Sequence, residues 1–318
     1  MQQFLNFRYI RTALFQTIVA FLIVRLSTVP NVVEAAGPVI GTAVAKGSFR
    51  VDNATVIGNA TLEEGATVET GSTVSSLELT NGTRLTLGLT SRGRVYGDHM
   101  VLERGESRLE RGSDYHVEAL GLTIKPETGN TSGRLSLVGA ARVRVAALTG
   151  SFRVLNSRGM LVANIGIGSA LDFEPQASST SGLAKVTGVV QRKNGHLTLT
   201  DETTNVTVEI TGPGVEREVG NRVEVIGSTD SSFTPVPEAS EYIRVTQVRR
   251  IGKGPAVASG AAAPAGAAPT AGSAGGIANV STGTLVIIGG VAVAATVGGL
   301  AAAHELPGQS GTTPQMSR

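Results

Sequence analysis

The sequence predicts an all-β protein, and three observations indicate this class. Between residues 37 and 253, apolar and polar side chains alternate with the period of two that places successive residues on opposite faces of a strand. No segment of this range sustains a helical period of 3.6 over twelve positions. Glycines separate the alternating runs at strand-length intervals, at positions 65, 71, 88, 93, 105, 112, 121, 129 and 133.

The composition excludes several classes of function. The 318 residues contain no Cys, which removes disulfide frameworks, thiol nucleophiles and Cys-ligated zinc. Of the 27 Lys and Arg residues only four lie outside residues 37–253, and of the 25 Asp and Glu residues only two do. The predicted folded region is therefore electrically balanced, although the whole chain has a pI near 9.1. It lacks the excess of positive charge that binds phosphate backbones, so we expect no nucleic-acid partner.

Residues 1–36 are typical of an export signal. Arg8 and Arg11 precede the apolar run Thr12–Val24, and a sequence suited to cleavage follows at Val33-Glu34-Ala35. The apolar run has 13 residues, whereas a membrane-spanning helix needs about 20. We therefore expect either a cleaved signal peptide or an uncleaved signal anchor, and in both cases export of the rest of the chain.

Residues 37–176 carry the clearest strand signals. Leu77 and Leu79 alternate with polar residues before Asn81-Gly82, and the alternation resumes at Leu85. This pattern predicts a β-hairpin, and the Asn-Gly pair favours a type I′ turn, which requires positive φ at both central residues.

The same region contains an internal repeat. The pentapeptide Gly-Ser-Phe-Arg-Val occurs at residues 47–51 and again at residues 150–154. Each copy continues through apolar strand residues to a glycine-led turn. We therefore expect two pseudo-symmetric strands that occupy equivalent positions in the core.

Residues 41–174 resemble the FecR domain of bacterial envelope proteins. The resemblance rests on the order and spacing of four stretches, at residues 65–71, 77–85, 102–106 and 148–154. The family-motif residues in them are Gly65, Thr70, Leu77, Leu79, Gly82, Gly105, Gly150, Phe152 and Val154. The resemblance implies a FecR-like β domain over residues 37–176.

Better-known members of that family relay a signal. Their periplasmic FecR domain connects an outer-membrane receptor to a cytoplasmic anti-sigma segment that precedes the membrane helix. In this sequence only about eleven residues precede the apolar run, which is too short for such a segment. The resemblance therefore implies only the exported part of the family's role.

After a Ser- and Thr-rich linker at residues 177–184, residues 185–253 predict a second, smaller β domain. The stretch Val219–Gly227 resembles the glycine-led strand of small bacterial OB-fold domains, through Gly220, Val223, Val225 and Gly227. Five strand-like runs fit a five-stranded OB-type barrel, at residues 185–192, 196–200, 206–210, 222–226 and 242–250.

The aromatic and charged residues of residues 185–253 limit what such a barrel binds. Phe233 and Tyr242 are its only aromatic residues, and nine basic residues face nine acidic ones. We expect no stacking platform over a positive groove, so nucleic acid is disfavoured. Oligosaccharide or peptide binding stays open.

The remaining residues predict a membrane attachment. Residues 254–280 are uncharged and rich in Gly, Ala and Pro, which predicts a flexible linker. Residues 281–303 form 23 positions without a charge, long enough for a single transmembrane helix before a short tail, 304–318. Small residues recur at every fourth position of this helix and predict a packing face for a homodimer, at Gly290, Ala294 and Gly298.

The sequence contains no recognisable active site. Adjacent strand residues point to opposite faces, so Asp98-His99 is not expected to form a catalytic pair. His116, which follows Asp114-Tyr115, is likewise expected to be a surface or turn histidine. No two His residues have helical metal-ligand spacing, and Gly166-Ile167-Gly168 lacks the next glycine of a dinucleotide motif. We therefore expect no enzymatic activity, no metal and no cofactor.

Together these features predict a non-enzymatic, membrane-tethered protein with its β domains in the periplasm, at the inner membrane of a bacterial envelope. It would act as a binding or scaffold module, or as an envelope sensor, for a periplasmic protein or glycan partner. Two alternatives stay open. One is a glycan-binding protein of the cell wall or exopolysaccharide, and the other is a signal-relay regulator of the FecR type.

Overall fold

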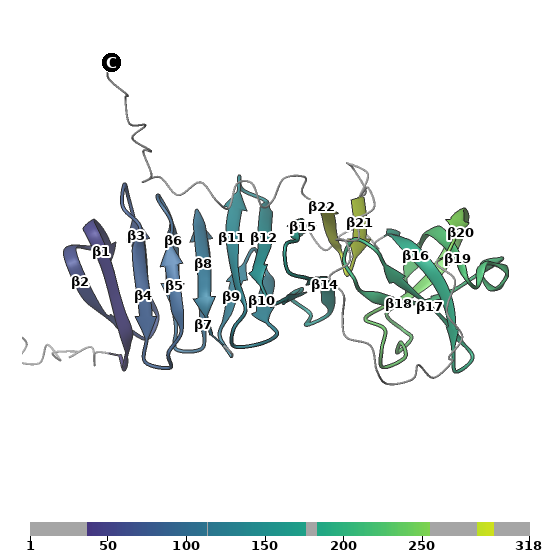
Figure 1. The fold of residues 1–318 in the computed structure, drawn as a ribbon, viewed down its shortest axis with the longest axis horizontal. Helices are drawn as coiled ribbons and strands as arrows, with labels where there is room; N and C mark the ends of the chain where they lie inside the picture. Colours follow the sequence, from purple (N-terminus) through teal and green to yellow (C-terminus); the bar gives the residue numbers. More distant parts are fainter. Residues whose placement is uncertain (1–36, 113, 176–182, 255–284, 296–318) are drawn as a thin grey trace, which may run out of the picture. The chain divides into compact units, whose positions relative to one another are not determined.

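A computed structural model describes residues 37–112, 114–175, 183–254 and 285–295 of the protein (Figure 1). Within these ranges the chain forms 22 strands, and its only helical element is the short 3-10 helix η1 (Val215–Glu218). The prediction of an all-β protein is therefore confirmed. A helix long and apolar enough to cross a membrane does not occur in the described ranges.

Two ladders of strands begin at β1 (Val39–Val51), one from each half of this long strand. The first ladder continues in order through β4 (Ser75–Leu79), β5 (Arg84–Leu87), β8 (Glu106–Arg111), β11 (Ser132–Val138), β12 (Arg142–Thr149) and β15 (Ala170–Pro175). The second ladder continues through β3 (Ala66–Thr70), β6 (Arg92–Val95), β7 (His99–Arg104), β9 (His116–Ala119), β10 (Leu122–Pro126), β13 (Phe152–Leu155) and β14 (Leu161–Ile165). All pairs are antiparallel except β7 with β9.

One hydrophobic core fills the space between the two ladders. Burial alternates along their strands, and the buried side chains of both ladders belong to a single cluster. Phe49 and Phe152, at the same position of the repeated pentapeptide, both insert into this cluster from the second ladder. The expectation of equivalent core positions for the two copies is thus met for their phenylalanines.

Two hairpin turns of this module use different geometries. The predicted hairpin of β4 and β5 is present, but its turn is not type I′, because Gly82 has a φ of +82° and Asn81 does not have a positive φ. The Asn81 side chain accepts a hydrogen bond from the Thr83 amide at 2.9 Å and so favours a three-residue loop with a left-handed glycine. Two consecutive positive φ angles occur instead at Asp52-Asn53, between β1 and β2 (Ala54–Glu63).

A closed five-stranded barrel follows, with its own hydrophobic core. Its strands are β16 (Leu183–Lys193), β17 (His196–Asp201), β18 (Thr207–Thr211), β19 (Asn221–Thr229) and β20 (Tyr242–Lys253). Strand β18 pairs in parallel with β20, and β19 closes the circuit by pairing with both β20 and β16. The five predicted strand runs coincide with these strands, and β16 begins two residues before the predicted domain.

The prediction of one helix over residues 281–303 is wrong for its described part. Strands β21 (Leu285–Ile288) and β22 (Val291–Ala295) form a hairpin around Gly289-Gly290, whose φ angles of +59° and +77° suit a two-glycine turn. Strand β22 pairs with β15 of the first ladder, and β21 pairs with β16 of the barrel. The predicted helical packing face does not form in residues 285–295, because Gly290 lies in the turn and Ala294 lies opposite Asp172 in a strand pair, while Gly298 is outside the described residues.

The hairpin lacks charges because both of its strands are buried. Val291 and Val293 belong to the core of the first module, whereas Val286 and Ile288 belong to the core of the barrel. A strand that is buried on both faces reads as a continuous apolar run. This is the same composition that a membrane helix has, and it explains the wrong prediction.

Polar groups from both modules hold the turn of this hairpin. The Asn156 Nδ2 atom donates a hydrogen bond to the Gly289 carbonyl at 2.9 Å, and the Gly289 amide donates to Glu241 Oε2 at 3.3 Å. Burial raises the pKa of the Glu241 carboxyl, although the Gly289 amide and the nearby Arg158 oppose this shift. The hairpin therefore binds to each module through both side chains and backbone.

Several predictions concern residues outside the described ranges. They are the signal at residues 1–36, the linker at 177–184 up to residue 182, the flexible linker at 254–280 beyond residue 254, and the tail at 304–318.

We predict that Val293→Ala lowers the free energy of unfolding by about 2 kcal/mol, because the substitution removes two methyl groups from a packed core. Chemical denaturation of the purified chain measures this change. The control is Val74→Ala, whose side chain is 49% exposed and whose effect should stay below about 0.5 kcal/mol. Equal effects of the two substitutions would show that the hairpin does not complete the core.

Candidate binding surfaces

The family-motif residues serve turns and core rather than one site. Thr70, Leu77, Leu79, Phe152, Val154, Val223 and Val225 are buried. Gly65, Gly82, Gly105, Gly150 and Gly220 have positive φ angles. At Gly227 a side chain is excluded, because a Cβ atom would lie 2.4 Å from the carbonyl oxygen of Arg244. These residues therefore form the turns and cores of the two modules, and the candidates for binding are residues on the outer faces.

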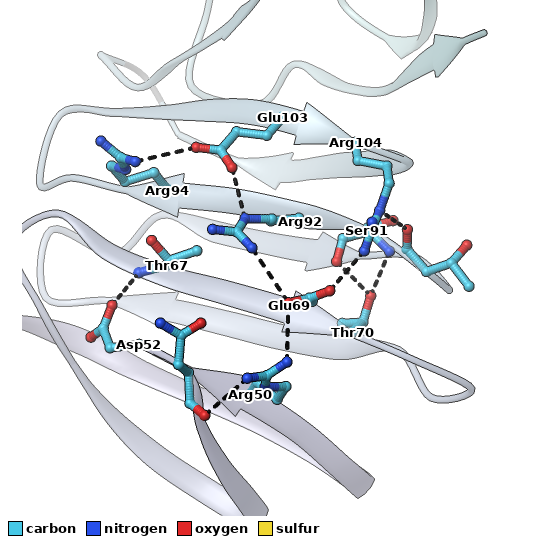
Figure 2. Close-up of polar contacts among 12 residues, drawn as sticks. Arg50, Asp52, Thr67, Glu69, Thr70, Ser91, Arg92, Arg94, Glu103 and Arg104 are labelled. Atoms are coloured by element: carbon cyan, nitrogen blue, oxygen red, sulfur yellow. Dashed lines mark hydrogen bonds and ion pairs between the residues drawn. The ribbon is translucent and has the colours of Figure 1, made fainter. Parts of the chain in front are cut away.

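A network of four arginines and two glutamates covers part of the outer face of the second ladder (Figure 2). Glu69 on β3 lies at its centre. The Arg104 Nη2 atom donates to Glu69 Oε1 at 2.8 Å, while the nearest nitrogens of Arg92 and Arg50 lie 3.6 and 3.9 Å from Glu69 Oε2. We call the six residues Arg50, Glu69, Arg92, Arg94, Glu103 and Arg104 the arginine network.

Glu103 on β7 is the second carboxylate of the arginine network. It accepts a hydrogen bond from Arg92 Nε at 2.8 Å and a longer one from Arg94 Nη2 at 3.4 Å. Arg92 therefore stands between both glutamates, as Figure 2 shows. Because neighbouring strands lie about 4.8 Å apart, the strand register brings these charges from β1, β3, β6 and β7 into one row.

Buried and backbone groups hold the strands of this row in place. Thr70 Oγ1 donates to the Gly88 carbonyl at 2.5 Å and accepts from the Ser91 amide at 2.8 Å, which ties the end of β3 to the start of β6. On the other side, Asp52 Oδ1 accepts from the Thr67 amide at 2.8 Å. The guanidinium groups thus project from a fixed backbone.

The sequence analysis did not identify the arginine network. Its residues span positions 50 to 104 and share no local motif. The alternation of Arg92 and Arg94 places both side chains on one face, but the sequence does not specify which strands are adjacent. A register prediction for β1, β3, β6 and β7 would have been necessary.

The barrel carries an exposed aromatic stack. The rings of Phe233 and Tyr242 lie 5.0 Å apart between centroids at an interplanar angle of 18°. The Arg244 guanidinium lies 5.7 Å from the Phe233 centroid and is held by Asp230 at 2.7 Å. Phe233 is 50% exposed. The sequence predicted no stacking platform from these two aromatic residues. In the structure they nevertheless form a stacked pair.

A third surface feature is a stack of Tyr96, His99 and His116. The ring centroids of Tyr96 and His99 are 4.3 Å apart, and those of His99 and His116 are 5.2 Å apart. The expectation that Asp98 and His99 point apart is wrong, because Asp98 precedes β7 in a turn and its Oδ1 lies 2.7 Å from His99 Nδ1. This contact lowers the pKa of the Asp98 carboxyl.

Metal binding has no support in the described residues, where no three His, Asp or Glu side chains cluster as metal ligands would. Neither a protein-family model nor a curated protein matches this sequence. A function can therefore be inferred only from the surfaces of the molecule.

We predict that Glu69→Gln lowers the free energy of unfolding by about 1 kcal/mol at low salt, because three arginines lose their shared counter-charge. The effect should shrink at high salt. The matched control is Glu78→Gln, which removes the partner of Arg84 alone from an exposed pair. A loss for Glu78→Gln as large as that for Glu69→Gln would contradict a central role for Glu69.

We predict that His116 makes the protein less stable in acid. Burial lowers its pKa, and His99 and Lys125 add to this effect, while Glu118 opposes it. The native state then binds fewer protons than the unfolded state, so stability falls as the pH drops below the ordinary value of 6.5 toward the folded pKa. Denaturation curves at several pH values should show a smaller acid loss for His116→Gln. An unchanged pH slope in the variant would refute this.

Proposed function

We propose that this chain is a non-enzymatic binding scaffold of the bacterial envelope and that its ligand is a cell-wall or exopolysaccharide glycan. We choose a glycan as the ligand because of one observation, the exposed stack of Phe233 and Tyr242 beside Arg244 on the barrel. The predicted export signal at residues 1–36 supports a location outside the cytoplasm. In this proposal the first module is of the FecR type and the barrel is of the OB type.

The strand pairing supports the OB assignment. In the OB fold a five-stranded Greek-key barrel binds oligonucleotides or oligosaccharides through one face and its adjacent loops. Here Phe233 lies in the loop between β19 and β20, and Tyr242 begins β20. The closed circuit of β16 to β20, with its parallel pair of β18 and β20, is consistent with such a barrel.

The chemistry of the stack favours a sugar over a nucleic acid. A sugar ring offers one face of C–H groups, which packs on an aromatic surface, and hydroxyls at its edge, which need hydrogen-bond partners. Arg244, Asp230 and the backbone of the same loop supply polar groups beside the rings. Nucleic acid would require a positive groove as well, and the barrel's nine basic residues are balanced by nine acidic ones.

The scaffold role draws support from the hairpin of β21 and β22. This hairpin supplies core residues to both modules and so links the barrel to the first module. A partner bound at the first module and a glycan bound at the barrel would then be held by one continuous unit. This arrangement is what a scaffold requires.

We predict that the full chain is retained on isolated cell-wall or exopolysaccharide material and that Phe233→Ala and Tyr242→Ala each reduce retention about tenfold, since stacking on one aromatic ring contributes about 1–3 kcal/mol. A quantitative pull-down measures this. Ile57→Ala is the control, because Ile57 is 80% exposed and lies on β2, outside the barrel. Failure of the wild type to bind, or an equal loss for Ile57→Ala, would end the glycan proposal.

A further inference from the structure

We infer that the arginine network is a second binding site, for the carboxylate groups of an acidic polysaccharide. The site lies on the first module and goes beyond the glycan platform proposed for the barrel. Four arginines share two glutamates there, so the six residues carry an excess of two positive charges.

Most donors of these arginines are free to bind a ligand. A guanidinium group has five N–H donors in a planar fork. Among the described residues, Arg50 donates one hydrogen bond, to the Asn53 carbonyl, and its ion pair with Glu69 is long at 3.9 Å. Arg94 donates a hydrogen bond of 3.4 Å to Glu103 and also interacts with the Tyr96 hydroxyl, which raises the pKa of the Arg94 guanidinium. Even Arg104, with bonds to Glu69 and the Thr90 carbonyl, uses only part of its fork.

The arginines are also accessible and held in position. Their side chains are 49%, 37%, 47% and 59% exposed for Arg50, Arg92, Arg94 and Arg104, whereas Glu69 and Glu103 are only 23% and 32% exposed. The carboxylates thus lie lower, against the sheet, and orient guanidinium groups that face the solvent. A ligand would meet positive groups whose ordering cost is already reduced.

The geometry suits an extended polyanion that lies across the strands, with Glu69 between Arg50 and Arg92 in the row. Arg50 and Arg92 are two strands apart, on the order of 10 Å, and Arg92 lies directly opposite Arg104 on the next strand. Arginine forks bind planar carboxylates through two parallel hydrogen bonds. A chain of uronic-acid sugars, lying across the strands, would bring successive carboxylates to successive arginines.

Other polyanionic surfaces fit less well. Tyr96, the aromatic residue that contacts Arg94, already stacks on His99, so it offers a nucleobase at most one face. The six residues of the arginine network include no large apolar side chain that could enter a lipid bilayer beside anionic headgroups. These side chains therefore favour a hydrophilic polymer.

The test measures binding of the full chain to polygalacturonate, with uncharged dextran as the negative probe, at low and high salt. We expect saturable binding to polygalacturonate that weakens with salt. The double variant Arg50→Gln/Arg104→Gln should lose about tenfold or more in affinity, because it removes two charge-assisted contacts. The matched control Arg84→Gln/Arg142→Gln removes the same charge from exposed residues on the first ladder and should lose less than about twofold.

The outcomes separate this site from the barrel. The loss caused by Arg50→Gln/Arg104→Gln should be the same in the wild-type chain and in a Phe233→Ala background, so failure of the glycan platform does not affect the result. No binding by the wild type, or an equal loss in both double variants, would overturn the inference. Equal or tighter binding of single-stranded DNA or of anionic lipid vesicles at the same arginines would also overturn it. If the double variant unfolds, Arg94→Gln, which removes the long contact with Glu103 and the contact with Tyr96, should still reduce affinity severalfold.

Discussion

The fold depends on one constraint: two hydrophobic cores share a single hairpin. Strand β15 ends the first ladder and β16 borders the barrel, and each pairs with a strand of the hairpin. Because Val293 and Val286 fill different cores from adjacent strands, neither module is complete without residues far away in the sequence. Local strand propensity builds the ladders and the barrel, but this distant hairpin joins the two modules.

The second constraint is strand register, which arranges the charges on the outer faces. The chain as a whole is nearly neutral. On the first ladder, Arg144 meets a single acidic partner, Asp172, directly across the strands, whereas Arg108 lies opposite Arg134. On the second ladder, several arginines converge on Glu69 instead. The same residue types therefore form isolated ion pairs at one place and a connected network at another.

The strands could be predicted from the sequence because apolar and polar residues alternate along them with a period of two. This alternation located the hairpin at Leu77 to Leu85 and all five barrel strands. It failed at residues 285–295, where an uncharged run buried on both faces resembles a membrane helix in composition. It also missed the arginine network and the Phe233–Tyr242 stack. Both arise from residues brought together by register and loop closure, which no local pattern encodes.

The hairpin also constrains how the chain acquires its structure during synthesis. Asn156 and Gly289 form a hydrogen bond across 133 positions, and the strands between them are made long before their last partner. Until residues 285–295 leave the ribosome, β15 and β16 each keep an unpaired edge, and both interiors lack valines. Completion of both cores is thereby postponed until these late residues have been made.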